Sequence, residues 1–433
     1  MRRPFLPDPV VIRPFHRRSA AAGAARRPSR LRPARVATPA AASSPRTAPM
    51  RRFPIGIATR LSLVMALLAA PSLTPAFIEF EEETGVILLH NELRPYYDSN
   101  INANSEEEDD FIFQSRPTLQ FLRKSGLLHL DLEAGAELAW FADFSEFDYQ
   151  NFVSDARLEF PKQNERNYWY HIAGGYNQSS NPDRFLGERI DSDATTVEGA
   201  FRYNFSDRFG AQASVGFLDS AYDGGSRQNR GSLADDTEIR GRLDAVYIYS
   251  DKLDILAGYQ YSDTDSDYDF EDHTFVIGLN GEITPKIQGK LETGWQFRRA
   301  APVTGGNQDK PFASIALSWL PNDRWNVTAD VASAYGITST GGSEDGFRGG
   351  LTVAWLINDK LIATLGGGYE DITYDTPGFT RDDEAIFLNG GVEYIFSERA
   401  QLRADFRYED WDSDDEFRTY ERWIAGLTFR FSL

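Results

Sequence analysis

Hydrophobic and polar positions alternate with a period of two along most of the chain. In residues 128–140 the even positions from Leu128 to Trp140 carry Leu, Ala and Trp, while the odd positions carry mainly His, Asp, Glu and Gly. Residues 207–217 and 401–408 repeat the alternation. A period of two is typical of strands with two unlike faces. About eighteen such segments can be placed end to end, with almost no helical period between them.

The connections between these segments alternate between short and long. The short ones are RKSG, PKQNER, FSDRF, YSDK, ITPK, LPNDR, INDK and FSER. The long ones include DSNINANSEEEDD, NQSSNPDRFLGERIDSD, LDSAYDGGSRQNRGSLADD, SDTDSDYDFED and YEDITYDTPGFTRDDE. Short turns on one side and long loops on the other are typical of outer-membrane barrels. The pattern predicts an all-β, transmembrane, antiparallel up-and-down β-barrel of about 18 strands (range 16–18).

The barrel must close on itself. A backbone in lipid has to satisfy its hydrogen bonds internally, so an open sheet edge is not tolerated. The first strand, about 86–97, is therefore expected to pair with the last, about 419–431. Both termini would then lie on the short-turn side, which is the periplasmic side in outer-membrane barrels.

Short turns of the type FSDRF recur as YSDKL, ITPKI, LPNDRW, INDKL and FSERA. The apolar residues that flank each turn keep the same parity, so both face lipid. Ser, Asp and Asn are expected to make the local hydrogen bonds of the turn. The repeated turn is thus predicted to mark the periplasmic rim.

Aromatic residues are expected to form two girdles on the apolar faces. The set beside the short turns is Phe205, Phe209, Tyr249, Trp319, Trp325, Trp355 and Phe396. The set at the far ends is Trp140, Tyr176, Phe217, Tyr261, Trp295, Tyr335 and Tyr369. The ten residues from Trp325 to Tyr335 span about 25 Å of height in a tilted strand, the thickness of the apolar band.

The first part of the chain differs in composition. Residues 1–49 are rich in Arg, Ala and Pro and are expected to be a disordered leader, either a mis-assigned start or a genuine extension. Residues 50–76 carry a basic segment, an apolar segment and a small-residue cleavage site, and predict a signal peptide. The barrel is expected to occupy 77–433.

The net charge of the chain limits which functions are possible. The chain carries 45 basic and 65 acidic residues and no cysteine. Residues 1–76 hold 14 of the basic residues and one of the acidic ones, so residues 77–433 have a formal net charge of about −33. Nucleic-acid binding needs a basic face and is excluded. The mean hydropathy of −0.44 fits a barrel whose strands have one polar face.

Charged residues occupy the polar face of the strands and are predicted to line the lumen. Opposite charges are expected on neighbouring strands, either as a web of ion pairs that stiffens the wall or as a transverse field that sorts polar solutes. A long loop such as 177–193 or 218–236 could fold inward and narrow the pore. The predicted lumen-lining residues are Arg116, Asp131, Glu133, Glu137, Arg157, Arg202, Arg240, Arg242, Lys290, Glu292, Arg348, Arg403, Asp405, Arg407 and Arg430.

Two features resemble known outer-membrane proteins. In the C-terminal segment Gly426, Phe429 and Phe431 resemble the signal read by the barrel assembly machinery, although Ile424 and Leu433 depart from it. The stretches LRPYYDSNI (93–101), EEEDDF, FIFQSRPTLQF and GGYEDITYD (367–375) resemble the putative β-barrel porin 2 family. The resemblance implies a passive outer-membrane channel, related to barrels encoded with exopolysaccharide export systems, and implies no specific functional residue.

Catalytic and metal-binding motifs are not evident. The five histidines are dispersed and no H-E-x-x-H or G-x-S-x-G motif occurs. The loop DTDSDYDFED lacks the Gly and Glu of a calcium loop, which favours a solvated acidic rim that binds divalent cations loosely. No enzyme activity, cofactor or specific metal site is predicted.

The function predicted from these features is a porin-like channel for passive passage of polar solutes through a Gram-negative outer membrane, with exopolysaccharide export as the narrower form. The expected partners are outer-membrane lipid and lipopolysaccharide, the barrel assembly machinery, and polysaccharide or small polar solutes. Two alternatives stay open. One is a closed structural or surface-binding barrel with acidic outer loops, and the other is a hydrolase with its site at the outer rim.

Overall fold

The computed structural model describes residues 78–79, 85–161, 167–224 and 233–432. The predicted leader and signal peptide lie outside the described residues. Eighteen long strands form the barrel, in agreement with the number of about eighteen expected from the sequence. They are β2 (Gly85–Asp98), β3 (Asp110–Ser125), β4 (Leu128–Phe141), β5 (Tyr149–Phe160), β6 (Tyr168–Ser179), β8 (Glu188–Asn204), β9 (Phe209–Gly224), β10 (Asp236–Ser250), β11 (Leu253–Asp265), β12 (Phe270–Thr284), β13 (Ile287–Ala300), β14 (Gln308–Asn322), β15 (Trp325–Ile337), β16 (Ser343–Asn358), β17 (Leu361–Thr376), β18 (Phe379–Ser397), β19 (Ala400–Ser413) and β20 (Tyr420–Ser432).

Four short elements accompany the barrel strands in the described part of the chain. They are the two-residue strands β1 (Ile78–Glu79) and β7 (Pro182–Asp183) and the 3-10 turns η2 (Ser145–Phe147) and η3 (Pro302–Thr304). No helix among the described residues is long and apolar enough to cross a membrane.

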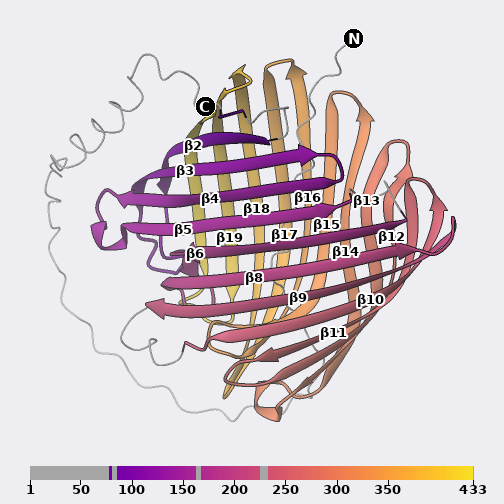
Figure 1. Cartoon of the computed structure of the whole chain (residues 1–433). Coiled ribbons are helices and arrows are strands. Elements are labelled where there is room, and N and C mark those ends of the chain that lie inside the picture. The colour runs from indigo at the N-terminus through magenta and orange to yellow at the C-terminus, as the bar shows by residue number, and fades with distance from the viewer. Residues whose placement is uncertain (1–77, 80–84, 162–166, 225–232, 433) are drawn as a thin grey trace, which may run out of the picture. The chain divides into compact units, whose positions relative to one another are not determined.

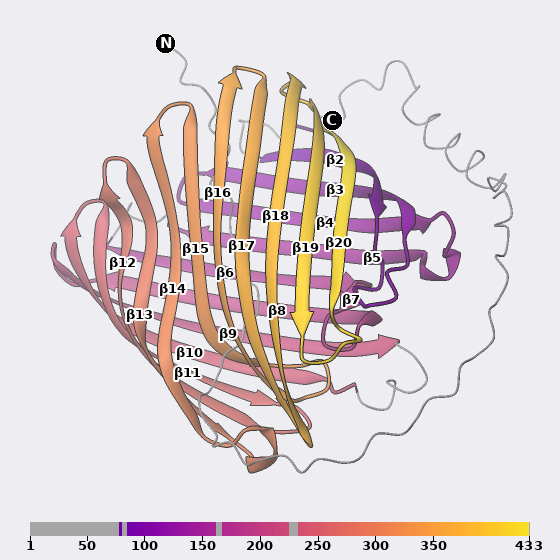
Figure 2. The same cartoon turned by 180° about the vertical axis from the view of Figure 1, so that it is seen from behind.

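Each barrel strand pairs antiparallel with the next, and the first pairs with the last. The closing registers run from His90 opposite Ser432 to Asp98 opposite Ile424. The prediction of a closed antiparallel barrel is confirmed, and the strand number is 18. In Figure 1 the strands of the front wall cross those of the back wall steeply, and Figure 2 shows the same crossing from behind. This crossing follows from the tilt that closure of a sheet requires.

The short turns share one hydrogen-bond device. In FSDRF the Ser206 hydroxyl accepts hydrogen bonds from the backbone N–H groups of Arg208 and Phe209. In the other five turns a Ser, Thr or Asn accepts from the backbone N–H of the Lys or Arg two residues later. The expectation of local side-chain hydrogen bonds in the short turns is therefore confirmed.

Several strands extend further at the long-loop rim than expected. The segment 369–384 was predicted as a long loop, but β17 runs to Thr376 and β18 begins at Phe379. The loop expected over 262–272 is likewise reduced to residues 266–269. In both places the prediction was wrong because the two strands stay paired through residues that are mostly polar. Polarity alone had suggested a loop there. In the first of them, Arg381 on the inner side contacts Asp383 at 2.8 Å, which satisfies its charge without a loop.

The far aromatic girdle contains one exception. Trp295 and Phe217 expose their rings on the outer face, as expected, but Tyr335 is buried. Pairing of β14 with β15 ends at Ala313 opposite Ser333. Beyond that point the Tyr335 ring lies under Arg298 and Lys310, 4.8 and 4.4 Å from the ring centroid. The prediction for Tyr335 was wrong because the tip of this hairpin leaves the cylinder and packs against side chains of the inner face.

Candidate functional site: the inner wall and its inward loop

The inner wall consists of the strand positions that alternate with exposed large hydrophobic side chains. On β4, for example, the exposed Leu132 separates Asp131 from Glu133. Following the pair registers around the sheet assigns every strand one inner and one outer set of positions. All fifteen residues predicted to line the lumen occupy inner positions. Their part in conduction remains a prediction.

Most charges on this wall are paired in the plane of the sheet. Some pairs lie two residues apart on one strand, as Arg242 with Asp244 and Lys290 with Glu292. Others join neighbouring strands, as Arg430 of β20 with Glu92 of β2. These contacts support the web of ion pairs expected from the sequence.

A third kind of pair crosses intervening strands. Arg242 of β10 also contacts Glu292 of β13 at 2.6 Å, so the pair passes over β11 and β12. The positions beneath it carry glycine. A Cβ at Gly258 would lie 2.0 Å from the Asp244 carboxylate, and one at Gly278 would lie 2.9 Å from Glu292. The missing side chains let the charged groups lie flat against the wall.

The same device recurs elsewhere on the wall. Arg94 of β2 contacts Asp405 of β19 at 3.0 Å, across β20. The position between them is Gly426, where a Cβ would lie 2.9 Å from the Cβ of Tyr96. Gly426 therefore has a role in the packing of the wall. The assembly signal proposed for Gly426, Phe429 and Phe431 is not addressed by these contacts.

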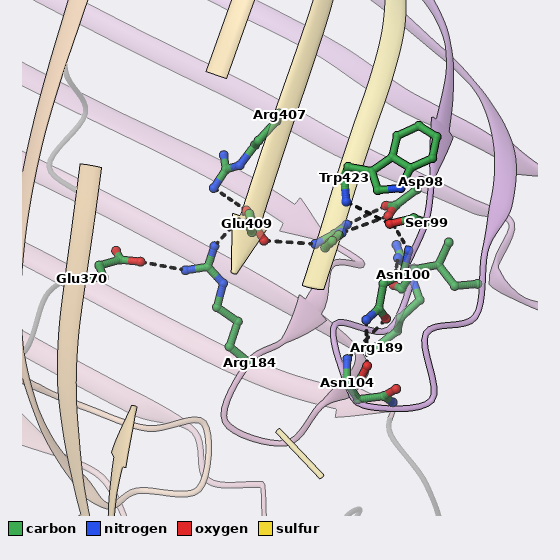
Figure 3. Close-up of polar contacts among 12 residues, drawn as sticks. Asp98, Ser99, Asn100, Asn104, Arg184, Arg189, Glu370, Arg407, Glu409 and Trp423 are labelled. Atoms are coloured by element: carbon green, nitrogen blue, oxygen red, sulfur yellow. Dashed lines mark hydrogen bonds and ion pairs between the residues drawn. The ribbon is translucent and has the colours of Figure 1, made fainter. Parts of the chain in front are cut away.

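The loop of residues 180–187, named the inward loop, reaches the opposite wall. It connects β6 to β8, yet its Arg184 contacts Glu370 of β17 at 3.1 Å and Glu409 of β19 at 3.4 Å. Figure 3 shows Arg184 between these two carboxylates, with Arg407 on the other side of Glu409. The expectation that a long loop such as 177–193 folds inward is confirmed for this segment.

Apolar packing holds the tip of the inward loop. The ring of Phe185 lies 5.1 Å from that of Tyr374 and is covered by the Arg381 guanidinium, which donates a hydrogen bond to the Phe185 carbonyl. Leu186 and Ile190 are buried in the same cluster. Burial of such side chains contributes about 1.5–3 kcal/mol each. The loop is therefore anchored by packing as well as by charge.

Gly187 ends the inward loop in a conformation that favours glycine. Its φ is +63°, and a Cβ at this position would lie 1.9 Å from a guanidinium nitrogen of Arg418. The Gly187 N–H donates to the Asp183 carbonyl, and the Asp183 carboxylate accepts from the Leu186 N–H. The loop thus closes on itself in a tight turn whose tip carries Arg184 and Phe185.

The loop between β2 and β3 lies against the inward loop. Asn104 donates to the Gly187 carbonyl at 2.8 Å, and Arg189 donates to the Ile101 carbonyl at 3.0 Å. Ile101 is fully buried, in a cluster with Phe141. Figure 3 shows Asn104 and Arg189 beside the Asp98–Asn100 turn. The two loops therefore support each other at the long-loop end of the barrel.

Arg184 is charged in this setting. Burial alone would lower the pKa of its guanidinium, but the carboxylates of Glu409 and Glu370 act in the opposite direction and the net pKa is raised. Glu409 also contacts Arg407 at 2.5 Å and Arg422 at 3.9 Å. A single carboxylate therefore sits among three guanidiniums, which offsets the cost of burying it.

Two open recesses lie on the described inner wall. One, of about 280 Å³, lies over β4 to β8 and includes Asp131, Glu133, Asp155, Arg157 and Glu198. The other, of about 150 Å³, lies over β15 to β19 and includes Asp330, Arg348, Asn389 and Arg407. The two recesses belong to opposite parts of the strand order.

Histidines and acidic loops form no recognisable reactive centre in the described part of the chain. His90 contacts Ser432 and Gln120, and His171 lies 3.8 and 3.7 Å from Glu159 and Glu198. Among the residues with described positions, no three His, Asp or Glu side chains are arranged to hold a metal ion.

Comparison with protein families finds a match in the C-terminal part of the chain. Residues 273–433 match the model of the putative beta-barrel porin 2 family. The match runs from within β12 to the C-terminus and includes GGYEDITYD, whereas LRPYYDSNI lies outside it. The resemblance to this family is confirmed. The chain folds as a closed β-barrel with an apolar outer face, and its C-terminal part is similar to this porin family.

Solved structures of outer-membrane proteins are similar at low identity. OpdQ of Pseudomonas aeruginosa shares 14% identity with a TM-score of 0.42, over 80% of this chain and 98% of that one. The outer membrane protein OpdK of the same organism shares 12% identity with a TM-score of 0.43, over the same fractions. The siderophore receptor PirA shares 10% identity with a TM-score of 0.37, over 79% of this chain and 80% of that one. No curated protein matches the sequence.

The sequence did not single out the residues of the inward loop that make these contacts. Arg184 and Phe185 stand in a polar loop, NQSSNPDRFLGERIDSD, where an Arg next to two large apolar residues is the one departure. Exposed loop tips seldom place Phe and Leu together unless they pack against something. The triplet Arg-Phe-Leu was therefore the available signal.

Proposed function

We propose that this porin-like barrel is a passive channel for polar solutes, narrowed at its outer end by the inward loop. The observation that carries the proposal is the contact of Arg184 with Glu370 and Glu409 across the barrel. An inner wall of paired charges, crossed by a folded loop, supports a water-filled path with a restricted section.

Orientation follows from the distribution of turns and loops. The short turns and both ends of the barrel sheet lie at one rim, and the longer loops lie at the other. We place the short-turn rim and the termini in the periplasm and the loops outside, among lipopolysaccharide. Recognition by the barrel assembly machinery would use the C-terminal strand with Gly426, Phe429 and Phe431.

Exopolysaccharide export is the narrower form of the proposal. A polymer needs a continuous path past the inward loop, so export would require Arg184 and Phe185 to leave the opposite wall. Single small solutes need only the space beside the loop. The two forms therefore differ in whether loop movement is obligatory.

A closed structural barrel is the second candidate. It is favoured by the packing of the outer loops, in which Asn100, Ile101 and Ala103 are all fully or almost fully buried. In such a barrel the acidic outer loops would bind partners and the lumen would carry no flow.

Planar-bilayer recording separates the two candidates. The purified full-length protein, inserted in bilayers and bathed in potassium chloride, is expected to give discrete conductance steps. Swelling of protein-containing liposomes in small sugars would measure the passage of neutral solutes in parallel. Absence of both conductance and swelling, with a barrel that still shows heat-modifiable migration in gels, would favour the closed structural barrel.

A further inference from the structure

The recess over β15 to β19 contains two partly exposed guanidiniums. Side chains of Arg348 and Arg407 are 37% and 43% exposed, whereas those of Arg242 and Arg202 are 12% and 5% exposed. Exposed guanidiniums on a lumen wall can exchange water for a ligand. The recess therefore contains guanidinium donors that are more accessible than those of Arg242 and Arg202.

Neighbouring side chains fix the direction of these guanidiniums. Arg348 contacts Glu370 at 3.4 Å, and both Arg348 and Arg407 lie over the Phe387 ring, 5.2 and 5.8 Å from its centroid. Stacking on an aromatic ring holds a guanidinium plane in place, and Arg407 also contacts Glu409 at 2.5 Å. The Nε of Arg407 is buried and has no hydrogen-bond partner among the described residues.

Gly350 lines the recess, and Gly366 lies beside two of its lining side chains, Asn389 and Thr352. A Cβ at Gly350 would lie 3.0 Å from the Asp330 carboxylate, and one at Gly366 would lie 2.5 Å from the Asn389 amide oxygen and 2.7 Å from the Thr352 hydroxyl. These polar groups rest directly over the backbone. The space above them, about 150 Å³, is large enough for more than a single ion.

The chemistry of the lining is mixed. Two guanidiniums suit a carboxylate, which arginine binds through paired N–H groups. The carboxylate of Asp330, on the same recess, repels a bare anion but accepts hydrogen bonds from hydroxyl groups. Asn389 and Thr352 add further donors and acceptors. A ligand with one carboxylate and several hydroxyls satisfies all of these groups together.

We propose that this recess binds a carboxylated sugar unit, either a free sugar acid or one residue of an acidic saccharide, on its way through the barrel. The proposal rests on the proposed channel, since the recess opens on the inner wall. The recess lies next to Glu370 and Glu409, the carboxylates that hold the inward loop, so a solute would be held just before or just after the narrow section.

Calorimetry with the full-length protein in detergent tests the site itself. Glucuronate is the probe, with glucose and acetate as the matched neutral and non-hydroxylated ligands. Glucuronate is expected to bind at least about tenfold more tightly than either, and R348Q and R407Q should each weaken it about tenfold, the effect of one lost charge-assisted contact. R299Q, which removes an exposed arginine on the outer face, should leave binding unchanged.

Two results would overturn the site. Equal binding of acetate and glucuronate would remove the sugar-acid assignment, and unaltered binding in both arginine variants would place glucuronate elsewhere. Heat-modifiable migration in gels shows that each variant is folded. An acidic oligosaccharide that binds more tightly than glucuronate would assign the site to one unit of a polymer, and tighter binding of glucuronate would assign it to the free acid.

Current recordings distinguish a failure of the binding-site proposal from a failure of the channel proposal. Glucuronate added to one side should reduce the open current of the native protein, and less so that of R407Q. Conductance with no response to glucuronate would overturn the site and leave the channel intact. Calorimetric binding without any conductance would support the site and overturn the channel.

Discussion

At the scale of single residues, the wall depends on where glycine stands. Gly258 and Gly278 lie under the network of Arg242, Asp244 and Glu292, and Gly426 lies under Arg94 and Asp405. At these positions the absence of a Cβ lets the charged side chains lie flat on the sheet. Glycine in a strand costs stability by itself, so here that cost is offset by well-placed ion pairs.

Replacement of Gly258 tests this arrangement. In G258A the new methyl group would displace the Asp244 carboxylate from Arg242, and we expect a loss of about 1–3 kcal/mol, the cost of leaving a buried charged group partly unsatisfied. Gly216, also on the inner face, is the control, because a Cβ there would make only an ordinary contact, 3.8 Å from the Cβ of Arg240. Urea unfolding followed by tryptophan fluorescence in lipid vesicles should show a large effect for G258A and little for G216A. Equal effects would contradict the role of Gly258.

Residue placement was predictable and residue pairing was not. Alternation alone puts Arg242 and Glu292 on the same face, because parity follows from the register. Their contact across two intervening strands depends on the tilt of the barrel and on the glycines between them. Neither is visible in a single strand, which is why the sequence suggested neighbouring strands instead.

At the scale of elements, the inward loop is held to the opposite wall by ion pairs and by apolar packing. Arg184 supplies the charged contacts, and Phe185 supplies the packing against Tyr374. Loss of the charge should loosen the loop without releasing it fully. Loss of both should free it from the opposite wall.

The conductance of loop variants tests whether these contacts of the inward loop limit the current. R184A removes two charge-assisted contacts worth about 1.5–3 kcal/mol each, so we expect a severalfold higher single-channel conductance or more frequent large openings. The double variant R184A/F185A should exceed it. R208A, in the exposed FSDRF turn, is the control and should match the native protein. A native conductance in the double variant would show that the loop does not limit flow.

Element positions were largely predictable because each strand carries its own two-residue pattern. The errors occurred at the outer ends, where lipid no longer selects apolar residues. There β17 and β18 continue as a polar hairpin, and Tyr335 turns inward with the tip of β15. Both outcomes depend on contacts with other strands, for example Tyr335 with Lys310, and these are absent from a local pattern.

At the scale of the whole molecule, closure was predictable because lipid does not tolerate a free sheet edge. The pairing of β2 with β20 supplies that closure. The sequence alone did not predict how the loops pack together at the long-loop end of the barrel. This packing depends on contacts between segments that lie far apart in the chain, such as the hydrogen bond of Asn104 to Gly187.

The natural absence of cysteine allows a direct test of orientation. Asp269, in an outer loop, and Asp251, in a short turn, are both exposed. On intact cells a membrane-impermeant maleimide should label D269C and not D251C, while both should react after the outer membrane is opened. Labelling of D251C alone on intact cells would reverse the proposed orientation.

The inward loop also has a mechanical consequence. A closed sheet resists stretching along its strands, but a cylinder of eighteen strands bends easily into an ellipse under the lateral pressure of a bilayer. The Arg184 contacts join the segment after β6 to β17 and β19, which lie between about a third and a half of the circumference away. The loop therefore acts as an internal brace, and its release would change the roundness of the cylinder together with the width of the path.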